Sequence, residues 1–430
     1  MKWTFHETHP APRDLNHLHV CGGRACREFI SDVFVTKTAL YSVGPAFFVK
    51  TIVRCVQLFA AALCLSLGLV RGTVFNSSYI FFGAWVFCFL PGSPALAAAA
   101  TSEPVGVSTV SLLAASDTMV SVPFLRAAVS SGQVSSVAGN VISVAGAPAW
   151  TPGQFVYVAA TQPTTYYAFF GSGVLEGRSF TVTGNGADTL TVDLDGGTLT
   201  GVAAGDAVRI VPYWTLGTLF PASAAGSSFT PTIDVSSLQT TVALFVPANT
   251  GINGAAASTF FFFSGAWRQT GQSVSVSRND QVVPPGSPIK IRNAANSGVL
   301  VAAGAVAMQK LALPLATQMG VQQDNVLALS RPVPVSLNDS GLVASGAFAA
   351  SPNALARTDL LMVTDNTVPG LNKAASIFYI YYNSGWRKLG QPLSADFGSD
   401  VVFDSSKSVS IRKGPSLDGA KRYWINAATY

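Results

Sequence analysis

The chain has 430 residues and a mass of 44.7 kDa, enough for two or three domains. Charged residues make up only 11% of it and hydrophobic residues 49%, with a mean hydropathy of +0.39. Low charge with many aromatic residues excludes a disordered or acidic solvating chain. The net charge of +5 is not gathered into a stripe of Lys and Arg, which argues against a nucleic-acid-binding protein.

The composition changes near residue 97. All five cysteines and all four histidines lie within the first 88 residues, so residues 98–430 contain neither type. Residues 98–430 also carry 18 of the 26 basic and 17 of the 21 acidic residues, which leaves them close to neutral. The most apolar segment and the segment that would perform chemistry are therefore different pieces of the chain.

Two uncharged stretches, 55–70 and 79–90, precede this change. The second follows a basic residue, ends at a Pro-Gly pair and leads into Ala95-Leu96-Ala97. This order is typical of a secretory signal and predicts cleavage near Ala97. The alternative is that residues 55–97 stay uncleaved as a membrane anchor or hairpin, the chain's only membrane contact. Because the pattern starts so late, we expect translation to begin close to residue 70.

From Thr101 onward the chain predicts short strands separated by turns. Two hairpins are expected, 133–137 with 141–144 and 180–183 with 189–194, and a further strand at 207–211. Strands at roughly ten-residue spacing indicate an all-β fold of sandwich or barrel type. The one stretch with modest helical character is the Ala-rich segment 299–317.

An internal repeat occupies the C-terminal half. Residues 251–272 align without gaps on residues 370–391, and the similarity reaches Ile291-Arg292 and Ile411-Arg412. A period near 120 residues is that of a duplicated β-module, because solenoid repeats are much shorter. The identical pairs are Gly251/Gly370, Asn253/Asn372, Ala255/Ala374, Ala256/Ala375, Trp267/Trp386, Arg268/Arg387, Gly271/Gly390 and Gln272/Gln391.

With this repeat, the segments Tyr213-Trp214-Thr215-Leu216 and Arg331-Pro332-Val333-Pro334-Val335 resemble a family of exported proteins. Its members occur several to a genome in verrucomicrobial and related bacteria, and no activity is assigned to them. The resemblance runs from about Glu103 to the C-terminus and implies export. It supplies no catalytic residues, and the long N-terminal extension departs from the family pattern.

Without His or Cys, residues 98–430 cannot form a Ser-His-Asp or Cys-His centre or a His/Cys metal site. What remains is a pair of carboxylates, as in glycoside hydrolases. The only glutamates are Glu103 and Glu176, and for Glu176 an ion pair with Arg178 is the simpler interpretation. The segment Asp193–Gly197 lacks the spaced acidic positions of a calcium loop. We therefore expect no catalytic, metal or cofactor site.

Aromatic side chains are the other candidates. Trp267-Arg268 and Trp386-Arg387 are either structural corners between sheets or two equivalent ligand sites, and the structural interpretation is favoured because a duplicated fold duplicates its residues. Rings exposed on a β-face could stack on sugars, although burial of both faces is favoured. The residues of this candidate aromatic surface are Tyr166, Tyr167, Tyr379, Tyr381 and Tyr382.

The sequence thus predicts an N-terminal extension over 1–97, an N-terminal β-domain over 98–215 and a C-terminal β-region over 216–430. The last contains two related modules, about 235–293 and 355–413. We expect a non-catalytic protein exported to the periplasm, cell surface or exterior, acting by self-assembly or surface coating. The alternatives are a glycan-binding adhesin and, less favoured, a carboxylate-type glycoside hydrolase.

Overall fold

A computed structural model describes residues 103–245 and 250–430. The expected signal segment, its helix and the cleavage position near Ala97 lie outside the described residues. Contacts divide the chain into two compact units, residues 1–98 and 99–430. The described part is nearly all β, as predicted, and its helical elements are α4 (Leu216–Leu219) and a single 3-10 turn (Ala222–Ala224).

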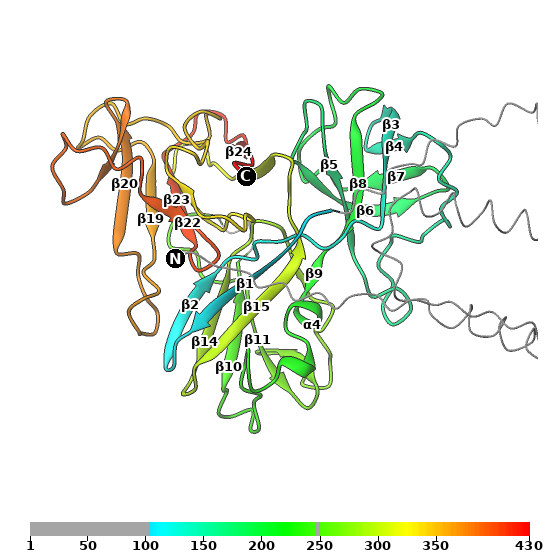
Figure 1. Cartoon of the computed structure of the whole chain (residues 1–430), viewed down its shortest axis with the longest axis horizontal. Coiled ribbons are helices and arrows are strands. Elements are labelled where there is room, and N and C mark those ends of the chain that lie inside the picture. Colours follow the sequence, from blue (N-terminus) through cyan, green and yellow to red (C-terminus); the bar gives the residue numbers. More distant parts are fainter. Residues whose placement is uncertain (1–102, 246–249) are drawn as a thin grey trace, which may run out of the picture. The chain divides into compact units, whose positions relative to one another are not determined.

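Six strands close into a barrel in the order β3-β4-β7-β6-β5-β8 (Figure 1). Both predicted hairpins are confirmed, as β3–β4 and β6–β7, because Gly139 and Asn140 turn the first and Gly186 lies in the turn of the second. The strands are β3 (Ser130–Ala138), β4 (Val141–Val144), β5 (Tyr166–Phe170), β6 (Ser179–Asn185), β7 (Thr189–Val192) and β8 (Ala207–Pro212).

The remaining strands form two matching groups. In the first group a five-stranded sheet runs β12-β11-β10-β14-β2, all neighbours being antiparallel. A ribbon of β1 with β15 and a short pair of β9 with β13 complete it. The strands are β1 (Val105–Leu112), β2 (Ser116–Val120), β9 (Trp214–Thr215), β10 (Thr240–Leu244), β11 (Ser258–Phe263), β12 (Ala266–Gln269), β13 (Val282–Val283), β14 (Ile289–Asn293) and β15 (Gly298–Ala305).

The second group repeats this arrangement strand for strand. Its sheet runs β21-β20-β19-β23-β17, its ribbon pairs β16 with β24, and its short pair joins β18 and β22. The strands are β16 (Leu311–Leu315), β17 (Gln323–Leu327), β18 (Val335–Ser336), β19 (Leu360–Val363), β20 (Ile377–Tyr382), β21 (Gly385–Lys388), β22 (Val401–Phe403), β23 (Val409–Lys413) and β24 (Arg422–Asn426). We call the two groups module 1 and module 2.

The barrel is inserted into module 1. It follows β2 and precedes β9, whereas in module 2 the equivalent strands β17 and β18 follow one another directly. The expected division at residue 215 therefore separates strands that pair, since β1 and β2 join β15 and β14. Sequence repetition could not reveal this, because the recognisable repeat begins only at Gly251.

The expectation of helical character over 299–317 is wrong. The segment forms β15 and β16, and in β15 the side chains alternate between exposed Val299 and Val301 and buried Leu300 and Ala302. Its small residues serve close packing: a Cβ on Gly304 would lie 2.5 Å from the carbonyl oxygen of Leu125. Alternation with period two is a strand pattern, which the alanine content obscured.

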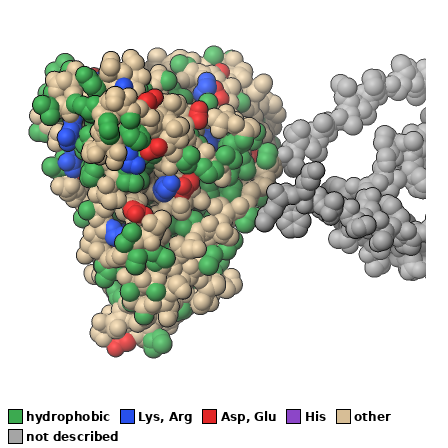
Figure 2. Space-filling view, turned by 60° about the vertical axis from the view of Figure 1, so that its left-hand side comes forward, with side chains coloured by type: hydrophobic (Ala, Val, Ile, Leu, Met, Phe, Trp, Pro, Cys, Tyr) green, Lys and Arg blue, Asp and Glu red, His purple; other side chains and the backbone are tan. Residues whose placement is uncertain are grey.

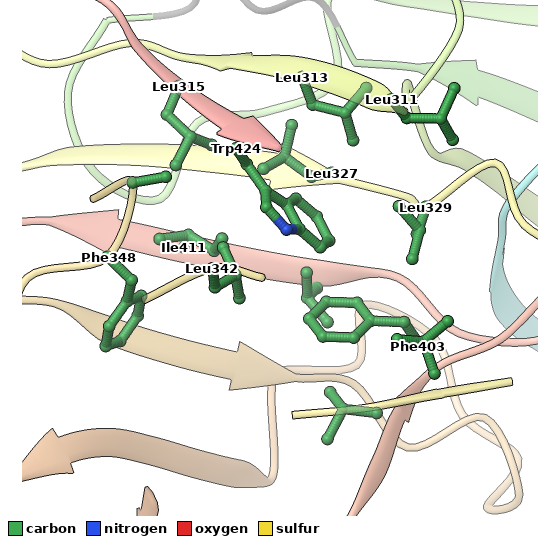
Figure 3. Close-up of a cluster of buried hydrophobic side chains, with 14 of the residues drawn as sticks. Leu311, Leu313, Leu315, Leu327, Leu329, Leu342, Phe348, Phe403, Ile411 and Trp424 are labelled. Carbon is green, nitrogen blue, oxygen red and sulfur yellow. The ribbon is translucent and has the colours of Figure 1, made fainter. Parts of the chain in front are cut away.

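Each body has its own apolar core. In module 2 the indole of Trp424 lies among leucines from several strands (Figure 3). The same cluster includes Tyr167, Phe169 and Val211 from the outer face of the barrel, while Ala168 and Phe170 fill the barrel interior. The aromatic strand β5 is therefore buried on both faces, as the uninterrupted apolar run favoured.

The segments 213–216 and 331–335 join these bodies. The indole N–H of Trp214 donates to the carbonyl of Phe124 (2.9 Å), and Thr215 caps α4. Arg331 is fully buried and donates to the carbonyls of Gln309 (2.9 Å) and Asn426 (2.8 Å). Gln309 lies in the linker between the modules, and Asn426 ends strand β24. The buried guanidinium of Arg331 therefore joins this linker to the C-terminal strand.

Candidate functional site

The two modules hold each other through a pair of matched loops. In the first half, Arg292 on β14 donates twice to the carboxylate of Asp117 on β2, at 2.6 and 2.8 Å. The loop before β20 completes the contact, because the backbone N–H of Asn372 donates to Asp117 (2.8 Å) and its side-chain oxygen accepts from Arg292 (2.5 Å). Asp117 N–H also donates to Gly370 O (2.8 Å). The loop of module 2 thus binds to the Asp117–Arg292 pair of module 1 through charge-assisted hydrogen bonds.

The second half repeats these bonds in the opposite direction. Arg412 on β23 donates twice to Asp324 on β17, at 2.7 and 2.9 Å. The N–H of Asn253 donates to Asp324 (2.7 Å), and its side-chain oxygen accepts from Arg412 (3.1 Å). Asp324 N–H donates to Gly251 O (3.0 Å). The two contacts are reciprocal, as at a two-fold interface between identical subunits.

This exchange explains why the repeat contains a Gly-x-Asn sequence in both copies. Asn253 and Asn372 have positive φ angles of 56° and 53°, which asparagine adopts more readily than most residues. Each also supplies the oxygen that accepts from the arginine of the other module. Sequence reasoning found the glycines, asparagines and arginines as repeated positions but missed Asp117 and Asp324, because the strands that bear them lie outside the aligned segments.

The ion pairs of this contact shift the pKa values of its charged side chains. Burial by itself raises the pKa of Asp117, but hydrogen bonds from Arg292 and Asn372 outweigh it and hold the pKa below its usual value. The same hydrogen bond raises the pKa of Arg292, and Asp324 raises that of Arg412 in the same way. The pair of Asp117 with Arg292 is therefore charged at neutral pH.

A cavity of about 360 Å³ lies between the two reciprocal contacts. It is bordered by both aspartates and both asparagines of those contacts, together with residues of the strands and loops around them. These are Met119, Phe245, Gly254, Lys290, Val326, Met362, Thr364, Lys373, Ala374, Ala375 and Ser410.

The two Trp-Arg corners lie inside the cores. Trp267 and Trp386 are 0% and 1% exposed, so neither offers a ring face to a ligand. The indole N–H of Trp267 donates to Phe220 O (3.0 Å). Arg268 Nε donates to Phe263 O (3.4 Å), and Arg387 donates to two backbone carbonyls. These contacts are those of packed corners between strands.

The candidate aromatic surface is divided between two bodies. Tyr167 and Tyr379 are buried, and Tyr379 donates to Asp400 (2.6 Å), where burial and that carboxylate raise its pKa. Tyr166, Tyr381 and Tyr382 are half-buried. They come from β5 and β20, strands that share no sheet. The five rings therefore do not line one open face.

The glutamates are engaged by cations. Glu103 pairs with Arg209 at 2.5 Å, beside a groove between the barrel and the β1–β15 ribbon. Glu176 pairs with Lys310 at 3.0 Å, so the expected pair with Arg178 is wrong. The guanidinium of Arg178 instead lies 3.7 Å from the ring centroid of Tyr423, because the barrel packs against module 2 at this point.

The expected turn at Asp193–Gly197 is present, with positive φ at Asp195 and Gly196. Asp195 pairs with Lys421 at 2.6 Å. Among the described residues no group of three or more His, Cys, Asp or Glu side chains is placed to hold a metal ion. The same part of the chain contains no apolar helix of membrane-spanning length. Figure 2 shows basic and acidic side chains interspersed on one face of the molecule, without a single-sign stripe.

No family model, no curated protein and no solved structure matches this chain.

Proposed function

We propose that this is an exported, non-catalytic protein that assembles with copies of itself at the cell envelope or outside the cell. The contact between copies is the ribbon of β1 with β15. One observation carries this assignment: the ribbon presents an uncharged, valine-rich face to solvent, and no strand of the described residues pairs with the outer edge of β1.

The outward face of the ribbon is uncharged and carries four exposed valines beside Thr109 and Ser111. Val105 and Val107 are 75% and 68% exposed, and Val299 and Val301 are 43% and 53% exposed. The register places Val107 opposite Ala303 and Thr109 opposite Val301, so these side chains form one continuous surface. None of the residues from Val105 to Leu112 or from Gly298 to Ala305 is charged. Contiguous apolar patches of this kind mark interaction surfaces.

The outer edge of β1 has no strand partner, although the hydroxyl of Ser108 on this strand donates to Ser405 of module 2 (2.9 Å). No strand of the described residues pairs with the side of β1 that faces away from β15. The pairing of β1 with β15 runs over eight residue pairs without a bulge. Soluble proteins usually protect such an edge with Lys, Pro or a bulge, none of which is present here. Two copies can therefore pair their β1 strands antiparallel about a two-fold axis, giving a four-stranded sheet.

Module 2 supports this assignment from within the chain. Its equivalent ribbon, β16 with β24, is covered by the barrel: Ala312 N–H donates to Gly177 O (3.0 Å), and Arg178 stacks on Tyr423. A ribbon in this position of the module thus accepts another β-surface in one of its two occurrences. In the proposed assembly, a second copy of the chain packs on the β1–β15 ribbon, as the barrel packs on the β16–β24 ribbon within one chain.

Export rests on the sequence. The basic residue, apolar stretch and Ala95-Leu96-Ala97 predict signal cleavage, and the resemblance to the verrucomicrobial family points the same way. Residues 98–430 contain no cysteine, so the exported part needs no disulfide chemistry outside the cell.

The test measures the mass of the protein in solution. Residues 99–430, the compact unit, are analysed by size-exclusion chromatography with light scattering, and the assemblies are imaged by electron microscopy. We expect concentration-dependent dimers or larger assemblies that dissociate in the Val107→Lys and Val301→Lys variants, because a lysine on the edge strand opposes strand pairing and a charge at Val301 interrupts the apolar face beside it. Val174→Lys, at a valine that is 66% exposed on the barrel, is the matched control and should assemble normally. A strict monomer at every concentration, or assemblies indifferent to both ribbon variants, would overturn the proposal.

A further inference from the structure

The cavity between the modules has a symmetric frame but an asymmetric charge. In module 1, Lys290 on β14 lies opposite Met119 and Ala243. In module 2 the same register position is Ser410, opposite Val326 and Met362. The cavity therefore has a lysine where its other half has a serine.

The loops repeat this difference. Lys373 follows Asn372 in the loop from module 2, and the equivalent position after Asn253 is Gly254. Since the loop with Lys373 contacts Asp117 on module 1, both lysines belong to the half of the cavity that contains Asp117. One half of the lining carries two cations, and the other carries Ser410 and Gly254 in their place.

The aspartates of the cavity form their ion pairs with arginines and not with these lysines. Asp117 and Asp324 are each held bidentately by an arginine, Arg292 or Arg412. Within the described residues Lys290 forms no ion pair, and the Nζ of Lys373 donates to the carbonyl of Val368 (3.1 Å). The two carboxylates of the lining are thus paired with guanidinium groups, and within the described residues neither lysine of the lining forms an ion pair, although Asp365 lies near enough to act on Lys373.

Partial burial disfavours the charged form of Lys373. It lowers the pKa of Lys373, since desolvation disfavours the ammonium form, although the carboxylates of Asp117 and Asp365 act in the opposite direction. A bound anion would stabilise the charged form. The rest of the lining is largely apolar and includes Met119 and Met362, whose flexible side chains adapt to different shapes.

We propose that this cavity binds a small amphiphilic anion. Its carboxylate or phosphate head lies between Lys290 and Lys373, and its apolar chain or ring extends along Met119 and Met362 toward Ser410. The volume of about 360 Å³ falls in the range of small-molecule sites, which combine apolar walls with a few polar groups. The site is separate from the assembly surface, because none of the valines of the β1–β15 ribbon lines it.

Isothermal titration calorimetry of the full chain provides the first test. Octanoate and octyl phosphate, which share the chain and differ in the head, should each bind saturably, and the stronger of the two identifies the preferred head. The uncharged octanol should bind at least about tenfold more weakly, because a charge-assisted hydrogen bond contributes about that factor in affinity. Absence of saturable binding of both anions up to about 10 mM, or equal binding of octanol, would overturn the proposal.

Two variants test the head group. Lys290→Gln and Lys373→Gln should each weaken binding of the preferred anion about tenfold. Lys421→Gln removes an exposed lysine that pairs with Asp195 on the barrel, and it should bind like the parent chain. Binding unchanged in both cavity variants would place the anion elsewhere and refute the site.

A measurement on the unaltered chain avoids any effect of substitution on folding. The protein is acetylated at lysines with and without the preferred anion, and the modified residues are counted by mass spectrometry. The anion should protect Lys290 and Lys373 and leave Lys421 as reactive as before. Equal modification of the three lysines with and without the anion would contradict the anion site. The same result would have no bearing on the proposed self-assembly through the β1–β15 ribbon.

Discussion

The β1–β15 and β16–β24 ribbons occupy the same position in two modules of the same topology, yet only one of them is covered within the chain. The barrel lies against β16–β24 through the Gly177–Ala312 hydrogen bond and the Lys310–Glu176 ion pair. The β1–β15 ribbon carries solvent-exposed valines at the equivalent face. The difference arises because the inserted barrel belongs by sequence to module 1 but packs on module 2.

This comparison shows how a repeated module acquires different roles for its two copies. Module 2 uses its ribbon to hold the barrel, and three barrel residues, Tyr167, Phe169 and Val211, join its core cluster. In module 1 the ribbon keeps exposed valines at Val105, Val107, Val299 and Val301. The inner contact between the modules, in contrast, is reciprocal and treats both copies alike.

The largest expected effect on the free energy of unfolding tests whether the cores of the two modules are equivalent. Trp267→Ala and Trp386→Ala each remove a fully buried indole, and each should lower the free energy of unfolding by about 3–5 kcal/mol. Trp267 also loses its hydrogen bond to Phe220 O, so its substitution should cost more. Urea denaturation measures both. A loss below about 1 kcal/mol at either position would show that the two cores are not equivalent.

The next prediction tests whether the β16–β24 ribbon is covered and the β1–β15 ribbon is exposed. Ala312→Lys on the covered ribbon places a charge where the parent side chain is 7% exposed, and it should cost about 2–4 kcal/mol. Val107→Lys on the open ribbon should change the free energy of unfolding of the monomer by less than about 0.5 kcal/mol. Thermal and urea unfolding at low protein concentration measure both. Equal costs at the two positions would mean that both ribbons are covered, or that neither is.

A smaller effect tests the reciprocal contact. Asp117→Asn and Asp324→Asn each leave an arginine without its carboxylate, and each should cost about 1–3 kcal/mol, because the arginines keep some contact with water. The double variant should cost less than the sum, since both contacts hold the same interface. Asp418→Asn, at an exposed pair with Arg422, is the control and should leave unfolding unchanged. Additive single effects would indicate that the two contacts act independently.

The smallest effect is a dependence on pH. The folded-state pKa of Asp117 lies below its model value of 3.8, so its contribution to stability is complete above that value and is lost as the pH falls through the lowered pKa. The free energy of unfolding should therefore decline below about pH 4. The decline should be shallower in Asp117→Asn, which no longer carries this carboxyl. Urea unfolding between neutral and acid pH compares the two, and parallel curves would contradict the assigned pKa.

Local sequence determined the strands well. Turn residues such as Gly139-Asn140 and alternating β-branched residues identified both barrel hairpins, because strand periodicity and turn conformation are properties of neighbouring residues. The repeat identified the aromatic strands β11 and β20 and their Trp-Arg corners. Alanine content misled the assignment of β15, since propensity is a weak indicator beside the burial pattern.

The candidate site could be predicted only in part. Gly251, Asn253, Gly370 and Asn372 were visible as repeated positions, but nothing in the alignment connected them with Asp117 or Asp324. Each loop bonds to a strand of the other module, more than 70 residues away in one half and more than 250 in the other. Such pairs are set by the meeting of whole sheets and leave no local pattern in the sequence.

The sequence by itself thus determined the all-β class, the repeat and the low, balanced charge of residues 98–430, because these depend on composition and short-range periodicity. Only the tertiary structure decided that the barrel is an insertion, that it covers the ribbon of the other module, and that two lysines gather at one end of an otherwise symmetric cavity. Those features depend on which surfaces exclude water from one another, and that choice is made by the packing of complete modules.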